Sequence, residues 1–198
     1  VRNLNIFENM CITEGYKFIA GIDEVGRGPL AGPVVACAVI LPKDTFIDGI
    51  NDSKKLSEQK RKKVLEDIRK CALSIGIGLV DQNIIDDINI LNATKLAMLR
   101  AVENLHIKPQ ILLIDALNIE YNLPQKAIIR GDERSISIAA ASIVAKVYRD
   151  KLMCKYAKEY PQYGFEKNKG YGSASHIESI KKYGICPLHR HSSIKNFI

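Results

Sequence analysis

The 198-residue sequence contains no tryptophan, few cysteines and no long hydrophobic run. The cysteines are scattered, odd in number and form no C-x-x-C pair, which predicts reduced thiols of a cytoplasmic protein and excludes a disulfide framework. No apolar stretch approaches the roughly 20 residues that a membrane-spanning helix needs, and the first ten residues contain no apolar signal-peptide core. We therefore expect a cytoplasmic protein that is neither secreted nor embedded in a membrane.

Acidic residues are in the minority. Lysine and arginine number 29 against 22 aspartates and glutamates, which gives a net charge of +7. This surplus favours a polyanionic partner such as nucleic acid, although solvated surface lysines produce the same composition. The length, the 46% hydrophobic content and the lack of repeats or low-complexity linkers predict a single domain spanning residues 1–198.

The pattern of apolar residues predicts an α/β protein. Runs rich in β-branched residues and bounded by Gly, Pro or charged residues predict five strands, at 17–25, 32–41, 73–80, 111–117 and 125–132. Helical spacing predicts helices at 57–72, 135–160 and 174–182, and a short helix followed by a longer one within 81–105. Strands that come first and then mix with helices indicate a mixed sheet covered by helices.

Four acidic residues lie at or near predicted strand ends. Asp23 and Glu24 lie near the end of the first strand, Asp115 near the end of the fourth, and Asp132 closes the fifth. Sites in α/β sheets gather at strand ends. Four neighbouring carboxylates would repel one another unless divalent cations neutralised them, and two such ions about 4 Å apart can promote phosphodiester cleavage. The pattern therefore predicts a metal site.

Each of these acids has a simpler interpretation. Asp132 could cap the helix that follows it, and Asp115 could be a polar strand end. Asp23 and Glu24 are adjacent strand residues, so their side chains should point to opposite faces of the sheet. How both could serve one site is left open by the sequence.

Residues 26–31, "GRGPLA", also fit the glycine pattern of a dinucleotide-binding turn. That motif requires a helix after the turn, whereas the proline-flanked, β-branched run that follows here predicts a strand. Nucleotide binding is therefore disfavoured.

Hydroxyl and basic side chains are candidates for phosphate binding. The helix predicted at 135–160 presents several of them at helical spacing beside small alanines, although an ordinary packed helix with a polar edge has the same pattern. Two more basic residues precede the helix at 57–72. The candidates are Lys54, Lys55, Ser135, Ser142, Lys146 and Arg149.

Seven stretches, taken in order from about residue 18 to 193, resemble the bacterial ribonuclease HII family. They are "GIDEVGRGPLAGPVV", "NDSKKLSEQKR", "INILNAT", "LIDA", "GDERSISIAAASIVAKVYRD", "YPQYGFEKNKGYGSASH" and "HRHS". Two departures are small: Ala116 stands where the family usually has glycine, and "HRHSS" replaces the more common "HRRSF".

The resemblance implies a ribonuclease H-like fold, with a mixed five-stranded sheet flanked by helices and a small helical C-terminal part at about 162–198. It implies a metal-dependent endonuclease that hydrolyses the RNA strand of RNA–DNA hybrids. The enzyme would also cut 5′ of single ribonucleotides embedded in duplex DNA, leaving 3′-hydroxyl and 5′-phosphate ends, as ribonucleotide removal in DNA repair and replication requires. Two Mg²⁺ or Mn²⁺ ions with substrate bound, and a monomeric protein, are part of the same expectation.

By motif match, the resemblance also assigns roles to individual residues. The four acids Asp23, Glu24, Asp115 and Asp132 would hold the metal ions. The turn formed by Gly26, Arg27 and Gly28 would read the ribose 2′-hydroxyl, and Tyr171 would pack on the sugar of the following deoxynucleotide.

Three further interpretations stay open. The protein could be a related metal nuclease that needs runs of ribonucleotides, or a hybrid-binding module without catalysis. The C-terminal "SSIKNFI" could contact a sliding clamp, although it lacks a glutamine-led peptide motif.

Overall fold

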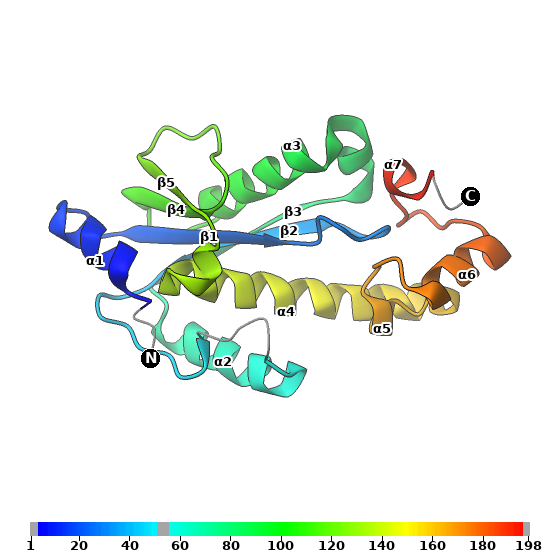
Figure 1. The fold of residues 1–198 in the computed structure, drawn as a ribbon, viewed down its shortest axis with the longest axis horizontal. Coiled ribbons are helices and arrows are strands. Elements are labelled where there is room, and N and C mark those ends of the chain that lie inside the picture. Colours follow the sequence, from blue (N-terminus) through cyan, green and yellow to red (C-terminus); the bar gives the residue numbers. More distant parts are fainter. Residues whose placement is uncertain (1–3, 51–55, 196–198) are drawn as a thin grey trace.

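In a computed structural model, which describes residues 4–50 and 56–195, a five-stranded mixed sheet lies between helices (Figure 1). The strands are β1 (Ile19–Val25), β2 (Val34–Ile40), β3 (Ser74–Val80), β4 (Ile111–Asp115) and β5 (Gln125–Ile128), in the spatial order β3-β2-β1-β4-β5. The pairs β1–β2 and β2–β3 are antiparallel, whereas β1–β4 and β4–β5 are parallel. The predicted mixed sheet is confirmed.

Helices cover both faces of the sheet. α3 (Gln82–Glu103) packs on one face, and α2 (Glu58–Cys71) and α4 (Ile136–Glu159) pack on the other (Figure 1). Every residue of β2 is buried, as expected of a strand covered on both sides. α4 lies so close to β1 that a Cβ on Gly21 would come within 2.1 Å of the backbone carbonyl carbon of Ser137.

The prediction of a short helix followed by a longer one within 81–105 is confirmed by a break in α3. Asn89 has a φ of 66°, and its side-chain oxygen accepts the backbone N–H groups of Leu91 and Asn92, as an N-cap does. Within residues 4–50 and 56–195, no helix is both long enough and apolar enough to cross a lipid bilayer.

The C-terminal residues form short helices at one end of the sheet (Figure 1). η3 (Pro161–Tyr163), α5 (Phe165–Asn168), α6 (Ala174–Tyr183) and α7 (His191–Ile194) surround a separate apolar cluster that includes Met153 of α4. Only α6 was predicted. At the other end lies α1 (Ile6–Thr13), which the sequence pattern also missed.

The fifth strand is shorter than predicted. It ends at Ile128, and the chain then turns through Arg130, whose φ of 56° is left-handed, into the 3-10 turn η2 (Gly131–Glu133). Asp132 therefore lies on a tight turn before α4 and not at a strand end. It is not the cap of α4 either, because Ser135 takes that position and accepts the N–H of Ile138.

The residue after Asp115 is held in an unfavourable conformation. Ala116 has a φ of 53°, where a side chain costs about 1–2 kcal/mol, and its N–H donates to the carbonyl of Ile128. We expect Ala116→Gly to raise the free energy of unfolding by about 0.5–1 kcal/mol. This net gain is the backbone strain that is relieved, less the conformational entropy that glycine adds to the unfolded chain. Urea unfolding measures the change. Ala157→Gly, inside α4, is the control and should destabilise the protein by about 1 kcal/mol.

Candidate active site

The four acids line one cavity of about 400 Å³. Ile22 of β1 pairs with Ile114 of the parallel strand β4. The next residue of each strand, Asp23 in β1 and Asp115 at the end of β4, therefore lies beside the other. Glu24 is the next residue of β1, and η2 adds Asp132. The remaining lining side chains are Val25, Arg61, Ser142, Ile143, Lys146 and Tyr171.

Asp23 and Glu24 both reach this cavity although they are neighbours on one strand. The backbone N–H of Glu24 donates to Asp23 Oδ1 at 2.7 Å, which holds the shorter carboxylate against the main chain. The longer Glu24 side chain extends to Arg27 in the turn, where Nη1 lies 3.3 Å from Oε1. Both residues remain paired with β2 and both line the cavity, so the two neighbours share it without a break in the strand.

The cavity is electrostatically unfavourable for its own carboxylates. Burial raises the pKa of Asp23 well above its usual value, and the charges of Glu24 and Asp115 raise it further. Burial also raises the pKa of Glu24, although the positive charge of Arg27 opposes this. Among the described residues, no group donates a hydrogen bond to the buried Oε2 of Glu24. Two of the carboxylates that gather here are therefore less readily ionised than usual.

The donor set suits a hard divalent cation, because every candidate ligand is a carboxylate oxygen. Asp115 is already oriented: its Oδ1 accepts the N–H of Gly131 at 2.7 Å. In the part of the chain that the structure describes, no three acidic, His or Cys side chains converge closely enough to enclose an ion. Mg²⁺ in proteins usually takes part of its coordination from water or phosphate.

A buried arginine from the C-terminal part holds the glycine–arginine–glycine turn. Arg190 donates to three carbonyl oxygens of the segment, those of Gly26 (2.6 Å), Arg27 (2.9 Å) and Gly32 (2.9 Å). Burial, followed by the positive charge of Arg149, lowers the pKa of Arg190 to about 9. The sequence did not identify this role, because an arginine in a basic tail looks like a surface residue. Only the "HRHS" motif hinted at it.

Arg149 is buried, as Arg190 is, whereas the sequence suggested that it lies on a face that binds phosphate. Its side chain is fully buried and donates to the carbonyls of Pro33 (2.9 Å), Ala31 (3.1 Å) and Lys169 (2.8 Å). These hydrogen bonds join the segment after the turn to the loop before Tyr171. The sequence predicted contact with a phosphate instead. Helical spacing predicted its helix correctly but not the face on which it lies.

Tyr171 lies directly beside the turn. A Cβ added to Gly28 would lie 3.7 Å from the Tyr171 ring, and the carbonyl of Gly170 accepts the N–H groups of Leu30 and Ala31. The ring is partly exposed and lines the same cavity as the acids. The fold thus brings the turn, the acids and this aromatic ring together.

Gly26 and Gly28 should respond differently to a methyl group. Gly26 has a φ of 95°, and a Cβ there would lie 2.4 Å from Arg149 Nε, so we expect Gly26→Ala to unfold at a temperature several degrees lower. Gly28→Ala meets no close contact within the protein and should unfold like the parent protein. Thermal unfolding followed by circular dichroism tests the difference, and equal losses in both variants would contradict it.

The remaining predicted phosphate-binding residues divide into three groups. Ser142 and Lys146 line the cavity, and the Ser142 hydroxyl lowers the pKa of Asp23, against the larger effect of burial. Ser135 is buried and its hydroxyl donates to Glu8 of α1 at 2.5 Å. Lys54 and Lys55 lie outside the described residues.

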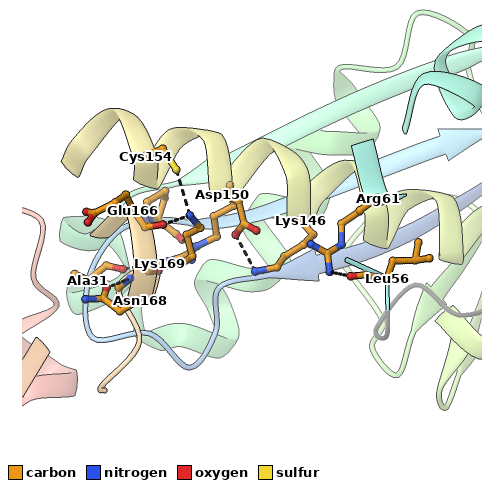
Figure 2. Close-up of polar contacts among 12 residues, drawn as sticks. Ala31, Leu56, Arg61, Lys146, Asp150, Cys154, Glu166, Asn168 and Lys169 are labelled. Carbon is orange, nitrogen blue, oxygen red and sulfur yellow. Dashed lines mark hydrogen bonds and ion pairs between the residues drawn. The ribbon is translucent and has the colours of Figure 1, made fainter. Parts of the chain in front are cut away.

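A second hollow, of about 380 Å³, adjoins the cavity between α2 and α4, and Arg61 lines both. Its two acids are paired, Glu58 with Lys62 at 2.7 Å and Asp150 with Lys146 at 2.8 Å. Figure 2 shows Arg61, Lys146, Asp150 and Lys169 along one side of α4, with Lys169 Nζ 3.2 Å from Cys154 Sγ. We call this hollow the basic groove, because three further basic side chains that belong to neither pair line it: Arg61, Lys151 and Lys169.

Comparison with protein families relates the chain to known nucleases. The family model described as Ribonuclease HII matches residues 20–196. A protein named Ribonuclease HII from Acetivibrio thermocellus is 58% identical, with all of this chain and 80% of that protein covered. A protein of the same name from Clostridioides difficile is 54% identical, with 100% and 78% covered.

Solved structures have the same fold. Ribonuclease H2 from Pyrococcus horikoshii superposes with a TM-score of 0.75 at 28% identity, with 91% of this chain and 96% of that chain covered. The structure of the PCNA:RNase HII complex from Archaeoglobus fulgidus gives a TM-score of 0.74 at 27% identity, with 88% and 94% covered. RNase HIII from Bst, solved in complex with Mn²⁺, shares the fold at 19% identity and a TM-score of 0.67, with 85% and 63% covered.

Proposed function

Because the chain belongs to the ribonuclease HII family, we propose that it is a divalent-metal-dependent endonuclease acting on the RNA strand of RNA–DNA hybrids. We further propose that it cuts 5′ of single ribonucleotides embedded in duplex DNA and leaves 3′-hydroxyl and 5′-phosphate ends. The observation that carries the proposal is the cavity that gathers four carboxylates beside the glycine–arginine–glycine turn and Tyr171. Such an activity would serve ribonucleotide removal in DNA repair and replication.

In this proposal Asp23, Glu24, Asp115 and Asp132 hold Mg²⁺ or Mn²⁺, which would activate a water molecule and stabilise the leaving oxygen. The protein orients these ligands. The Glu24 N–H holds the Asp23 carboxylate, and the Gly131 N–H holds Asp115. Cation binding would also relieve the mutual repulsion that raises the pKa of Asp23.

The turn is suited to reading a 2′-hydroxyl, the group that distinguishes RNA from DNA. Arg190 draws the carbonyls of Gly26 and Arg27 inward. Among the described residues, no acceptor takes the backbone N–H of Arg27 or Gly28. Because Gly28 has no side chain, a ribose can approach these groups closely. Tyr171 alongside offers a flat ring on which a deoxyribose can pack without the crowding that a 2′-hydroxyl would cause.

The decisive assay uses a DNA duplex that contains one ribonucleotide, with Mg²⁺, with Mn²⁺ and with a chelator. We expect one cut on the 5′ side of the ribonucleotide with either metal and none with chelator. Cleavage only within runs of ribonucleotides would favour the related nuclease with another preference. Binding without cleavage would favour a hybrid-binding module and would refute the proposal.

The basic groove predicts how binding depends on salt. If a phosphodiester backbone leaving the cavity passes along the groove, Lys151→Gln and Lys169→Gln should each lower the slope of log K against log salt by about 1. Substrate binding measured between low and moderate salt gives the slopes. Lys70→Gln, on the exposed end of α2 outside this groove, is the matched control and should leave the slope unchanged. Equal slopes in all variants would contradict a phosphate path through the groove.

A further inference from the structure

Two buried histidines lie behind the substrate-reading face. His176 of α6 and His189, which precedes α7, are 0% and 1% exposed, and their Nε2 atoms lie 3.1 Å apart. They are enclosed by the rings of Tyr163 and Phe165 in edge-on or tilted contacts. Neither histidine lines the catalytic cavity, so the proposed chemistry leaves this buried pair unexplained.

The hydrogen bonds around the pair determine where each proton lies. His176 Nδ1 is 2.8 Å from the carbonyl oxygen of Tyr171, which can only accept, so Nδ1 carries the proton. The backbone N–H of Cys186 can only donate and lies 2.9 Å from His189 Nδ1, so that nitrogen is the acceptor. His189 Nδ1 is also 3.3 Å from the Cys186 carbonyl, but that carbonyl already accepts the His189 backbone N–H at 3.0 Å.

When both imidazoles are neutral, every hydrogen bond around the pair has one donor and one acceptor. Because each neutral ring carries one proton, His189 must be protonated at Nε2 and His176 unprotonated at Nε2. The result is a one-way chain, from Cys186 N–H to His189, from His189 Nε2–H to His176, and from His176 Nδ1–H to the carbonyl of Tyr171.

We propose that His176 and His189 form a positioning device for Tyr171, which holds the backbone of that residue in place only while both imidazoles are neutral. The Tyr171 carbonyl also accepts the N–H of Ser173 at 2.8 Å, so the chain joins the residue to the start of α6. A shift of this backbone would move the ring away from Gly28. The inference rests on the proposed function only for its catalytic consequence.

Adding a proton to either ring would break the chain. A second proton on His176 would set two Nε2–H groups against each other, and one on His189 would oppose the N–H of Cys186. Burial lowers the pKa of both rings, that of His189 to about 4 with a further contribution from His176. Among the described residues, Tyr163 and Cys186 contact His189, and the charge of His191 lowers its pKa. Burial raises the pKa of Tyr163 and of Cys186, so neither offers a negative charge at neutral pH.

The proton positions can be observed directly in the parent protein. Long-range ¹H–¹⁵N correlation spectra of histidine-labelled protein at pH 7 should show His176 protonated at Nδ1 and His189 protonated at Nε2. Single substitutions assign the signals. The opposite tautomers, or a doubly protonated ring at pH 7, would overturn the proposal whether or not the protein is a nuclease.

Substitution of His176 tests the consequence for substrate choice. His176→Leu removes the donor to Tyr171, whereas His176→Asn places an amide N–H near the Nδ1 position. We expect His176→Leu to lower cleavage at a lone embedded ribonucleotide at least tenfold relative to a long RNA–DNA hybrid, and His176→Asn to restore most of the loss. In a Tyr171→Ala background, His176→Leu should cause no further change, because its effect acts through Tyr171.

A purely structural role gives a different result. It predicts equal losses on both substrates, and a further loss in the Tyr171→Ala background, and either would refute the proposal. The exposed His106, hydrogen-bonded to Ser74 at the end of the sheet away from the acids, supplies the control: His106→Leu should leave the substrate ratio unchanged. If the parent protein cuts neither substrate, the nuclease proposal fails, and the tautomers still decide the hydrogen-bond chain.

Discussion

Replacing Asp23 by asparagine is expected to lower the cleavage rate at least a hundredfold, on the scale of removing one preorganised charge-stabilising group, while the fold survives. In chelator the variant should unfold a few degrees higher than the parent, because about 1 kcal/mol shifts Tm by about 2–4 °C in a chain of this size. The gain comes from removing a buried carboxylate that burial, Glu24 and Asp115 all disfavour. Cleavage kinetics and calorimetry measure the two effects.

The gain should depend on pH in a defined direction. The pKa of Asp23 is higher in the folded protein than in the unfolded chain, so protonation stabilises the fold at low pH. That contribution is lost as the pH rises from the unfolded pKa through the folded pKa. Asparagine is uncharged throughout, so the advantage of the variant should grow over this range and then level off.

Substitution of an exposed acid outside the cavity is the control for general charge effects. Asp87→Asn changes an exposed carboxylate of α3 that does not line the cavity, and it should alter neither cleavage nor the unfolding temperature. Asp115→Asn should behave like Asp23→Asn, because the two strand ends share the cavity. Full activity in both cavity variants would refute the metal-binding role of the acids.

Replacing Tyr171 by alanine is expected to abolish most cleavage at a lone embedded ribonucleotide while metal and duplex binding persist. Under the proposed function, the turn at Gly26 and Gly28 would demand a 2′-hydroxyl, and the ring beside Gly28 would favour a deoxyribose on the 3′ side. Together they would read an RNA-to-DNA junction from sugar chemistry and shape, without base identity. The measurement compares a single-ribonucleotide duplex with a long RNA–DNA hybrid.

Gly28→Ala completes this comparison. Among the described residues its methyl group meets only the Tyr171 ring, at 3.7 Å, so the fold should persist while the approach of every ribose is blocked. Cleavage of both substrates should therefore fall together, in contrast to the selective loss in Tyr171→Ala. If Tyr171→Ala cuts the lone ribonucleotide as well as the parent does, the ring has no part in reading the junction.

Local patterns were enough to predict most of the secondary structure. The β-branched runs predicted all five strands, and helical spacing predicted α2, α4, α6 and the broken α3. The failures are short or strained segments, such as α1, α5 and α7, and the turn at Arg130 that ends β5 early. A helix of one or two turns carries too few apolar positions to establish a period, and the turn at Arg130 depends on contacts such as that between Gly131 and Asp115.

By itself, the sequence determined the fold class, the family resemblance and the four acids as candidate site residues, because those depend on residue types in fixed local order. Only the tertiary structure decided which polar groups face inward. It placed Arg190 inside against the carbonyls of the turn, placed Arg149 against those of the segment that follows it, and joined His176 to His189 behind Tyr171. These residues are polar, so hydrophobic periodicity says nothing of their burial. Their partners lie far away along the chain, and a buried polar group is stable only where the folded chain supplies them.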